Sequence, residues 1–334
     1  MSRPAATRRV VADASPSGPP QPLRVARRAL IMRALVTGAS GFVGIHLVAH
    51  LRASGDDVVE SSVDVTDRDR IAAHVADAAP DVIYHLAAQA DVGGSWNTPI
   101  PTLRVNVEGT VNVLDAAVAA GTERVLAVTS ADIYGPVEEA ALPLDEDQPV
   151  RPVSPYAASK AAADIMCVAA GLAHGLDVVR ARSFNHLGPG QTDRFVASAL
   201  ARRIAANERD EGSIVRVGNL EARRDFTDVR DVVRAYRLLV EHGGAGEVYH
   251  VCSGRDLPVR DLAEGLVRLA ATPMTLEVDP ALFRPVDLKV RRGDPTKLHD
   301  TTGWTPGIDL DTTLQDLLDY WRHHPDGVPT PTIA

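Results

Sequence analysis

The stretch A-L-V-T-G-A-S-G-F-V-G, residues 34–44, places a short apolar run directly before three glycines and the start of a helical pattern. A strand, a glycine turn and a helix in this order are what a dinucleotide site requires. Gly38 would permit the tight turn, Gly41 would let a pyrophosphate approach the backbone, and Gly44 would allow close packing of the helix on the strand. The helix N-terminus would then face the phosphates. The stretch therefore predicts a nucleotide-binding strand–turn–helix unit.

Strand and helix patterns alternate beyond this stretch. Apolar strand patterns recur at 58–61, 81–86, 125–129 and 178–181, with a further strand end at 64–67 that caps a helix beginning near Arg68. This alternation predicts an α/β fold, a Rossmann-type doubly wound parallel sheet with helices on both faces. Ligands of such sheets bind outside the carboxyl ends of the strands. The glycine turn, residues 86–89 and Ser130 all lie at such ends, so we expect them to share one crevice.

Composition shifts along the chain predict its domain boundaries. Residues 1–30 are rich in Pro, Ala and Arg, and we expect a disordered N-terminal extension, with Met32 a natural alternative start. The dinucleotide-binding domain is expected over 31–183, with a return segment at about 226–254. After the loop F-N-H-L-G-P-G-Q, residues 184–225 and 255–322 would form a smaller C-terminal α/β lobe that binds the substrate, and 323–334 a Pro-rich tail.

The bulk composition argues against several classes of partner and site. A net charge of -9 argues against a nucleic acid or an anionic membrane surface, and no apolar run approaches the about 20 residues that span a bilayer. Cys167 and Cys252 are too few for a disulfide framework, which predicts a cytoplasmic location. His46 and His50 are spaced i, i+4 but have no third ligand nearby, so we expect no metal site.

Two segments, V-T-S-A-D-I-Y-G and S-P-Y-A-A-S-K, carry residues suited to proton transfer. They place Ser130 at a strand end and Tyr156 one helical turn before Lys160. An ammonium beneath a phenol would lower the phenol's pKa, and a serine hydroxyl would hold the reacting oxygen. This set suits protonation of a carbonyl oxygen while hydride moves to the attached carbon. A Tyr-x-x-x-Lys pair taken alone is equally well a pair of residues on a helix surface.

The end of the second expected strand bears on the choice of dinucleotide. A site that prefers NAD usually has a carboxylate there for the ribose 2′-hydroxyl, but the expected position is about Ser62 and Glu60 is two residues early. No arginine stands ready for a 2′-phosphate either. The absence of a carboxylate at this position favours NADP(H), and both NADP(H) and NAD(H) stay open as cofactors.

The motifs together resemble a known family. The set T-G-A-S-G-F-V-G, H-L-A-A-Q, V-T-S-A-D-I-Y-G, S-P-Y-A-A-S-K and F-N-H resembles the extended short-chain dehydrogenase/reductases (the NAD-dependent epimerase/dehydratase family) that act on nucleotide sugars. The resemblance runs from Met32 to nearly Arg322. Within that family, G-N-L-E-A-R-R-D-F-T-D-V-R-D and R-P-V-D followed by G-D-P-T-K-L look like the GDP-mannose branch.

The resemblance implies roles for individual residues. It implies a catalytic set of Ser130, Asp132, Tyr156 and Lys160. Besides Tyr156 and Lys160, the implied cofactor contacts are Gly38, Gly41, Phe42, Val43, Gly44, Asp64, Val65, Leu86, Ala87, Ala88 and Asn106. Residue types alone also allow Asn106 to be a buried amide that bends its helix. The implied contacts to a GDP-sugar substrate are Gln89, Asn185, Asn219, Arg224, Arg284 and Asp287.

Asp132 decides which activity the resemblance favours. A dehydratase of this branch looks to need a glutamate here, as the base that removes the C5 proton of a 4-keto sugar, and Asp132 is one methylene shorter. The resemblance therefore implies NAD(P)H-dependent reduction of GDP-4-keto-6-deoxy-D-mannose to GDP-D-rhamnose or its C4 epimer. A GDP-mannose 4,6-dehydratase, another nucleotide-sugar 4-epimerase or dehydratase, and a non-catalytic NAD(P)-sensing module stay open. A homodimer is the default that the family implies.

Overall fold

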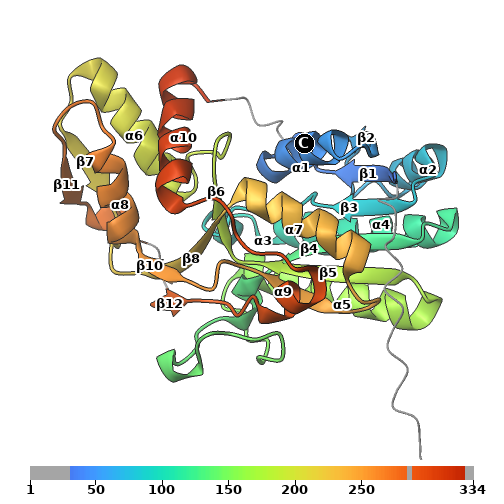
Figure 1. Ribbon diagram of the computed structural model, residues 1–334. Helices are drawn as coiled ribbons and strands as arrows, with labels where there is room; N and C mark the ends of the chain where they lie inside the picture. Colours follow the sequence, from blue (N-terminus) through green and yellow to red (C-terminus); the bar gives the residue numbers. More distant parts are fainter. Residues whose placement is uncertain (1–30, 284–287, 328–334) are drawn as a thin grey trace, which may run out of the picture. The chain divides into compact units, whose positions relative to one another are not determined.

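The central element of the fold is a six-stranded sheet, seen in a computed structural model that describes residues 31–283 and 288–327. The strand order is β2-β1-β3-β4-β5-β9, and every neighbouring pair is parallel. The bounds are β1 Arg33–Thr37, β2 Asp57–Ser61, β3 Val82–His85, β4 Arg124–Ser130, β5 Asp177–Ser183 and β9 Val248–Val251. The α/β class and the parallel Rossmann-type sheet are thus confirmed (Figure 1).

The strand end expected at 64–67 is wrong. The Asp64 carboxylate accepts hydrogen bonds from the backbone N–H and the hydroxyl of Thr66, both at 2.9 Å, and this closes a turn in place of a strand. Asp67 does cap the following helix, because its carboxylate accepts from the Arg70 N–H at 3.1 Å. That helix, α2, spans Arg68–Ala78 and begins where the sequence placed it.

Helices cover both faces of the sheet because side chains of each strand alternate between them. Ala34 and Val36 of β1 point into a core shared with α1 (Phe42–Ala53) and α7 (Val229–His242). Leu35 points into the opposite core, which α2, α4 (Gly109–Ala120) and α5 (Pro155–His174) complete. Figure 1 shows α7 crossing the sheet on the face opposite α4. α3 (Pro99–Leu103) precedes α4, and α9 (Thr296–Thr302) packs against α7.

A second group of elements has a core of its own. The helices α6 (Val196–Asp210), α8 (Val259–Arg268) and α10 (Leu310–His323) enclose it. Next to them β7 (Ile214–Val217) pairs with β11 (Thr275–Val278), while β8 (Arg223–Asp228) lies between β10 (Asp256–Pro258) and β12 (Val290–Arg291) and also pairs with β6 (Asn185–Leu187). These elements come from the stretches expected to form the smaller lobe, whose boundaries stay a prediction.

Within the described ranges, no helix is long and apolar enough to cross a membrane. The same ranges contain no group of three or more His, Cys, Asp or Glu side chains that could hold a metal ion. The Nε2 atom of His46, one of the two histidines weighed as ligands, instead lies 2.8 Å from the Pro189 carbonyl oxygen. Residues 1–30 and the predicted substrate contacts Arg284 and Asp287 lie outside the described residues.

Candidate active site

The glycine turn between β1 and α1 is shaped as a cradle. Gly38 has a φ of +68°, and a Cβ there would lie 2.8 Å from the Ala87 nitrogen, so only glycine fits between the turn and the end of β3. A Cβ on Gly44 would lie 2.2 Å from the Gly38 carbonyl oxygen, so α1 sits directly on the turn. The tight turn and the close packing predicted for Gly38 and Gly44 are confirmed.

The N-terminus of α1 fits the phosphates of a dinucleotide. The helix begins after Gly41 with no side chain capping its first N–H groups and no acid in its first turn. Uncapped N–H groups at the positive end of a helix dipole bind anions. The phenyl ring of Phe42 stacks on His186, with ring centroids 6.0 Å apart, and Val43 packs on the core beneath α1. The residues present therefore fit a dinucleotide, while its individual contacts stay predictions.

The end of β3 is held by a chain of hydrogen bonds through His85, which the sequence analysis overlooked. Thr110 Oγ1 donates to the Asn106 carbonyl, so it accepts from His85 Nε2 at 3.1 Å. His85 Nδ1 then accepts from Thr37 Oγ1 at 2.8 Å. Burial and, next, the Lys160 charge lower the pKa of His85 to about 3, so the ring stays neutral. The H-L-A-A-Q motif could have flagged a histidine that ties β3 to β1.

Asn106 is a buried amide in a π-helical turn, as the residue type allowed. Its Oδ1 accepts from the Gln89 N–H at 2.8 Å, and its Nδ2 donates to the Gln89 carbonyl and to Ser159 Oγ. Ser159 Oγ in turn donates to the Tyr156 carbonyl at 2.7 Å. Asn106 thus fixes the chain after β3, where Leu86, Ala87 and Ala88 lie, to α5. Ser159 is a further residue that the sequence reasoning missed.

The other cofactor candidates after β2 have structural partners. The Asp64 carboxylate is engaged by Thr66, as described above. Val65 is buried in the core, and its carbonyl accepts from Asn112 Nδ2 at 2.9 Å. The β2 strand ends at Ser61, one residue before the predicted position of an NAD-selecting carboxylate, so the exposed Ser62 occupies that place.

The predicted catalytic residues come together at the carboxyl edge of the sheet. Ser130 is the last residue of β4, and its Oγ accepts from the Asp132 N–H at 3.1 Å. Ser154 caps α5 by accepting from the Ala157 N–H at 3.1 Å, and Pro155 follows at the first helical position. This start places Tyr156 in the first turn of α5, where the Ser130 side chain acts to lower the pKa of its phenol.

The prediction that the Tyr156 phenol has a lowered pKa is wrong for this arrangement. Burial and, next, the nearby Asp132 carboxylate raise the pKa of Tyr156, while the Ser130 hydrogen bond acts the other way. The Lys160 Nζ donates to the Val128 carbonyl oxygen at 2.9 Å. Burial lowers the pKa of Lys160 to about 8. The cost of desolvating the phenolate therefore outweighs the lowering of the pKa that the Tyr156–Lys160 spacing predicted, and the phenol stays neutral.

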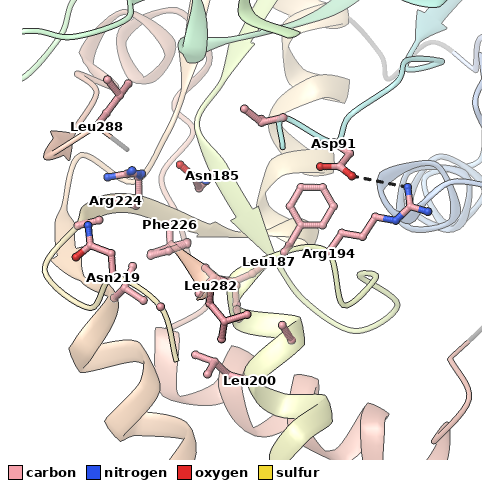
Figure 2. Close-up of a pocket in the computed structure, with 18 of the residues that line it drawn as sticks. Asp91, Asn185, Leu187, Arg194, Leu200, Asn219, Arg224, Phe226, Leu282 and Leu288 are labelled. Atoms are coloured by element: carbon pink, nitrogen blue, oxygen red, sulfur yellow. Dashed lines mark ion pairs between the residues drawn. The ribbon is translucent and has the colours of Figure 1, made fainter. Parts of the chain in front are cut away.

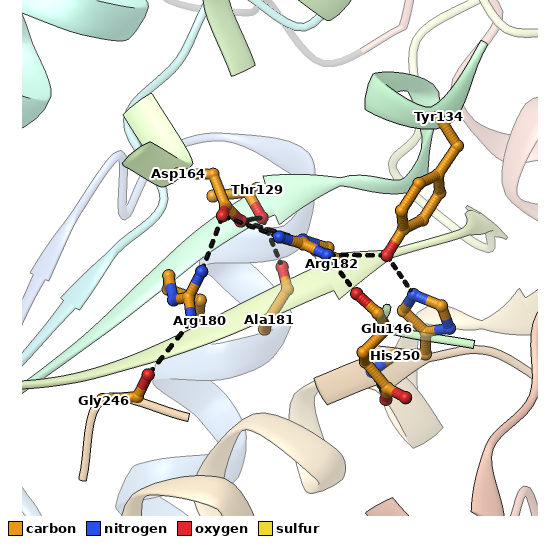
Figure 3. Close-up of polar contacts among 9 residues, drawn as sticks. All are labelled: Thr129, Tyr134, Glu146, Asp164, Arg180, Ala181, Arg182, Gly246 and His250. Atoms are coloured by element: carbon orange, nitrogen blue, oxygen red, sulfur yellow. Dashed lines mark hydrogen bonds and ion pairs between the residues drawn. The ribbon is translucent and has the colours of Figure 1, made fainter. Parts of the chain in front are cut away.

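A buried ionic network, missed in the sequence, supports the loop after Ser130. Asp164 of α5 accepts from Arg180 and Arg182 of β5, and Arg182 Nη1 also donates to the Tyr134 hydroxyl at 2.8 Å (Figure 3). Tyr134 lies 2.6 Å from His250 Nε2, which is neutral because burial lowers the pKa of that ring to about 3. These partners lie far apart in the sequence, so no local pattern indicated them.

A cavity of about 360 Å³ opens beside this edge toward the second lobe. Asn185, Asn219 and Arg224, all predicted substrate contacts, line it, and Figure 2 shows Asn185 between Arg224 on one side and Asp91 and Arg194 on the other. Gln89 is not among its lining residues; its side chain donates to the Asp91 carbonyl at 3.1 Å. Of the four predicted substrate contacts that the structure describes, three therefore lie in the wall of one cavity.

Asp132 also lines the cavity, together with Arg291, which the sequence analysis did not single out. The Asp132 carboxylate forms an ion pair with Arg291 of β12, and the Arg291 side chain is almost fully buried. The two residues lie 159 positions apart in the sequence, so no local pattern indicated the pair.

Known proteins resemble this chain along most of its length. The family model described as GDP-mannose 4,6 dehydratase matches residues 61–317. A GDP-6-deoxy-D-mannose reductase from Pseudomonas aeruginosa is 40% identical over 299 residues, which cover 88% of this chain and 98% of that protein. The structure of RMD from Pseudomonas aeruginosa complexed with NADPH has a TM-score of 0.81 at 38% identity and covers 87% of this chain and 99% of that one.

A more distant solved structure has the same fold with the other dinucleotide. The Thermus thermophilus UDP-glucose 4-epimerase complex with NAD has a TM-score of 0.78 at 29% identity and covers 86% of this chain and 98% of that one. The residues that the family model matches include Ser130, Tyr156 and Lys160, the whole cavity wall and both partners of the Asp132–Arg291 ion pair, while the glycine turn precedes them. The chain belongs to the GDP-mannose 4,6-dehydratase family of extended short-chain dehydrogenase/reductases, which are NAD(P)-dependent nucleotide-sugar oxidoreductases.

Proposed function

We propose that the protein reduces the 4-keto group of GDP-4-keto-6-deoxy-D-mannose to GDP-D-rhamnose or its C4 epimer. One observation carries the proposal: the buried phenol of Tyr156 lies at the carboxyl edge of the sheet, and Ser154 and Ala157, its near neighbours in the chain, line the cavity. Reduction of a carbonyl needs a proton donor at that place. The similarity to a GDP-6-deoxy-D-mannose reductase at 40% identity supports the same reaction.

The chain's own residues divide the work of this reaction. The Ser130 hydroxyl would position the carbonyl oxygen, and Tyr156 would donate its phenolic proton to that oxygen. Lys160, protonated below its pKa of about 8, would donate hydrogen bonds to the cofactor ribose. When bound, a reduced nicotinamide supplies the hydride for C4.

The cavity wall suits a nucleoside diphosphate sugar. Arg224 provides a planar guanidinium, which matches phosphate oxygens, in a chain whose net charge is -9. Asn185 and Asn219 provide amide groups that can bind sugar hydroxyls. Leu200, Phe226 and Leu282 add an apolar part of the wall that suits a base (Figure 2). For Gln89, Arg284 and Asp287, contacts with the substrate are proposed only because the family resemblance implies them.

The cofactor would be NADPH or NADH. The solved relatives were bound to NADPH in one case and to NAD in the other. Ser62 stands where an NAD-selecting carboxylate would be, which favours NADPH because a serine does not repel a 2′-phosphate. The ratio of kcat/KM for the two cofactors tests this preference, and a value favouring NADH would overturn it.

The main alternative is dehydration of GDP-mannose. It needs a base for the C5 proton, and Asp132 is the only acid of the A-D-I-Y segment that follows Ser130. A displacement of about 1 Å can cost a catalytic group about a hundredfold in rate. The shorter side chain and its pairing with Arg291 both favour reduction. A 4-epimerase would use the same phenol and need no added NADPH, whereas a non-catalytic NAD(P)-sensing module would have no use for a positioned proton donor.

Four incubations separate these activities. GDP-mannose and GDP-4-keto-6-deoxy-D-mannose are each incubated with the enzyme, with and without NADPH, and the products are identified by mass and, for epimers of equal mass, by NMR. We expect only the keto sugar with NADPH to react, gaining two hydrogens. Conversion of GDP-mannose without added NADPH would identify a dehydratase, and no conversion in any incubation would indicate a sensing module.

The homodimer also stays a prediction, and α5 is the surface to examine. Ile165, Val168 and Leu172 follow one another at helical spacing on α5 and are exposed, and Val118 of α4 is exposed as well. Such an apolar face on adjacent helices fits a second copy of the same chain.

Cys167 and Cys252 are free and buried, in keeping with the expected cytoplasmic location.

A further inference from the structure

The Asp132–Arg291 ion pair joins the catalytic loop to the second lobe. Asp132 lies in the short helical turn Ala131–Tyr134 directly after Ser130, and Arg291 lies on β12, 159 residues later. The Arg291 side chain is 5% exposed and that of Asp132 is 24% exposed. Both residues line the cavity, so the pair borders the space in which the sugar would bind.

The backbone around Arg291 fixes the direction of its side chain. Arg291 pairs in parallel with Arg224 of β8. The next residue, Arg292, accepts from the Leu144 N–H at 2.9 Å through its carbonyl, and the Gly293 N–H donates to the buried Asp225 carboxylate at 3.3 Å. A buried guanidinium requires an anionic or polar partner, and in the described structure Asp132 provides it. The carboxylate is therefore held toward β12.

We infer that Arg291 is a positioning residue that withholds the Asp132 carboxylate from the C5 hydrogen of the bound sugar and so restricts the site to chemistry at C4. The inference rests on the proposed function and deepens it. In the step that is prevented, the C5–H bond breaks, its proton passes to a carboxylate oxygen, and the electron pair moves into the C4 carbonyl as an enolate. By accepting that proton Asp132 would lose its negative charge, and the buried Arg291 cation would be left without an anionic partner.

Hydrogen exchange at C5 provides a direct readout. The keto sugar is incubated in D₂O with enzyme and NADP⁺, and deuterium at C5 is followed by NMR, with the rate without enzyme subtracted. Reduction with NADPH is measured in parallel. We expect the wild type to reduce the sugar with little C5 exchange. In Arg291→Gln the ratio of exchange to reduction should rise by at least about tenfold, because a positioned general base contributes about 10²–10⁴-fold.

Three further variants complete the test. Adding Asp132→Asn to Arg291→Gln should abolish the gain in exchange, since the freed carboxylate is then absent. Arg291→Lys keeps a cation and should give an intermediate ratio, and it carries the test if the glutamine variant does not fold. Arg292→Gln is the matched control, because Arg292 pairs with Asp256 and is not part of the cavity wall; its ratio should equal that of the wild type.

The outcomes separate the two proposals. Wild-type enzyme that reduces the keto sugar, with ratios for Arg291→Gln and Arg291→Lys equal to its own, would overturn the inference and leave the proposed function standing. Rapid C5 exchange by the wild type would also overturn the inference. A wild type that reduces nothing with either cofactor would refute the proposed function itself.

Discussion

At the scale of single residues, the environment of Tyr156 matters more than its spacing to Lys160. The sequence predicted the pair, but it could not show that burial and Asp132 raise the phenol's pKa while the ammonium contacts the Val128 carbonyl. A phenol that stays protonated is suited to donate a proton, as a reductase requires. The spacing therefore predicted the two residues, while the desolvation of the phenol depends on the folded structure.

Replacing Tyr156 by phenylalanine removes the proposed proton donor and little else. We expect kcat to fall by about 10²–10⁴-fold, while NADPH binding, followed by fluorescence, changes little. Tyr134→Phe is the matched control, because its hydroxyl contacts Arg182 and His250 and not the cavity. It should lower stability more than chemistry. Unchanged turnover in Tyr156→Phe would remove Tyr156 from its role.

Lys160 predicts the pH dependence of turnover. Burial lowers its pKa to about 8, so the ammonium is charged below that pH and neutral above it. Because the charge supports the proposed chemistry, kcat should be highest below about pH 8 and decline as pH rises through that value. A pH profile of kcat with saturating NADPH measures this. A profile that stays flat up to pH 10 would contradict the role given to the lysine.

At the scale of elements, the Asp164 network ties α5 to β5 beneath the catalytic loop. Burial opposes ionisation of Asp164, but hydrogen bonds and charges from Arg182 and Arg180 outweigh it and lower the carboxyl pKa (Figure 3). Arg180 and Arg182 of β5 lie 16 and 18 positions after Asp164 of α5, and none of the three belongs to a motif quoted from the sequence. The sequence predicted both elements correctly and gave no sign of what joins them.

Removing Asp164 leaves two buried guanidinium groups without their partner. Asp164→Ala should lower the free energy of unfolding by about 3–5 kcal/mol, measured by urea denaturation. Asp115→Ala is the control, because Asp115 forms a solvent-exposed pair with Arg68, and we expect a loss of at most about 1 kcal/mol. Equal losses in the two variants would show that the buried network contributes no more than a surface ion pair.

At the scale of the whole molecule, the sequence predicted the sheet well because a buried parallel strand has a simple apolar pattern. Residues 64–67 were misread because a short side-chain turn at Asp64 resembles a strand end. The site was predictable where motifs lie at a strand end, as with Gly38 and Ser130, or at the start of a helix, as with Tyr156. It was not predictable where distant elements meet, as with Arg291 and Asp132, because no local pattern encodes such a contact.

The association state belongs to this scale as well. If two copies meet through α5, Leu172→Glu should convert a dimer into a monomer. The Leu172 side chain is 85% exposed and is not part of any hydrophobic core of the described residues. Sedimentation velocity measures the change. Ile214→Glu on β7 is the control, because Ile214 is also exposed but lies in the second lobe. A wild-type protein that sediments as a monomer would refute the predicted homodimer.

The most direct test of the account follows the hydride. The enzyme is supplied with GDP-4-keto-6-deoxy-D-mannose and NADPH that carries deuterium at C4 of the nicotinamide, on the face that is transferred. The account predicts a 6-deoxyhexose product with one deuterium, located at C4 of the sugar by NMR. A product without deuterium, or GDP-mannose turned over while the labelled NADPH is not consumed, would contradict it.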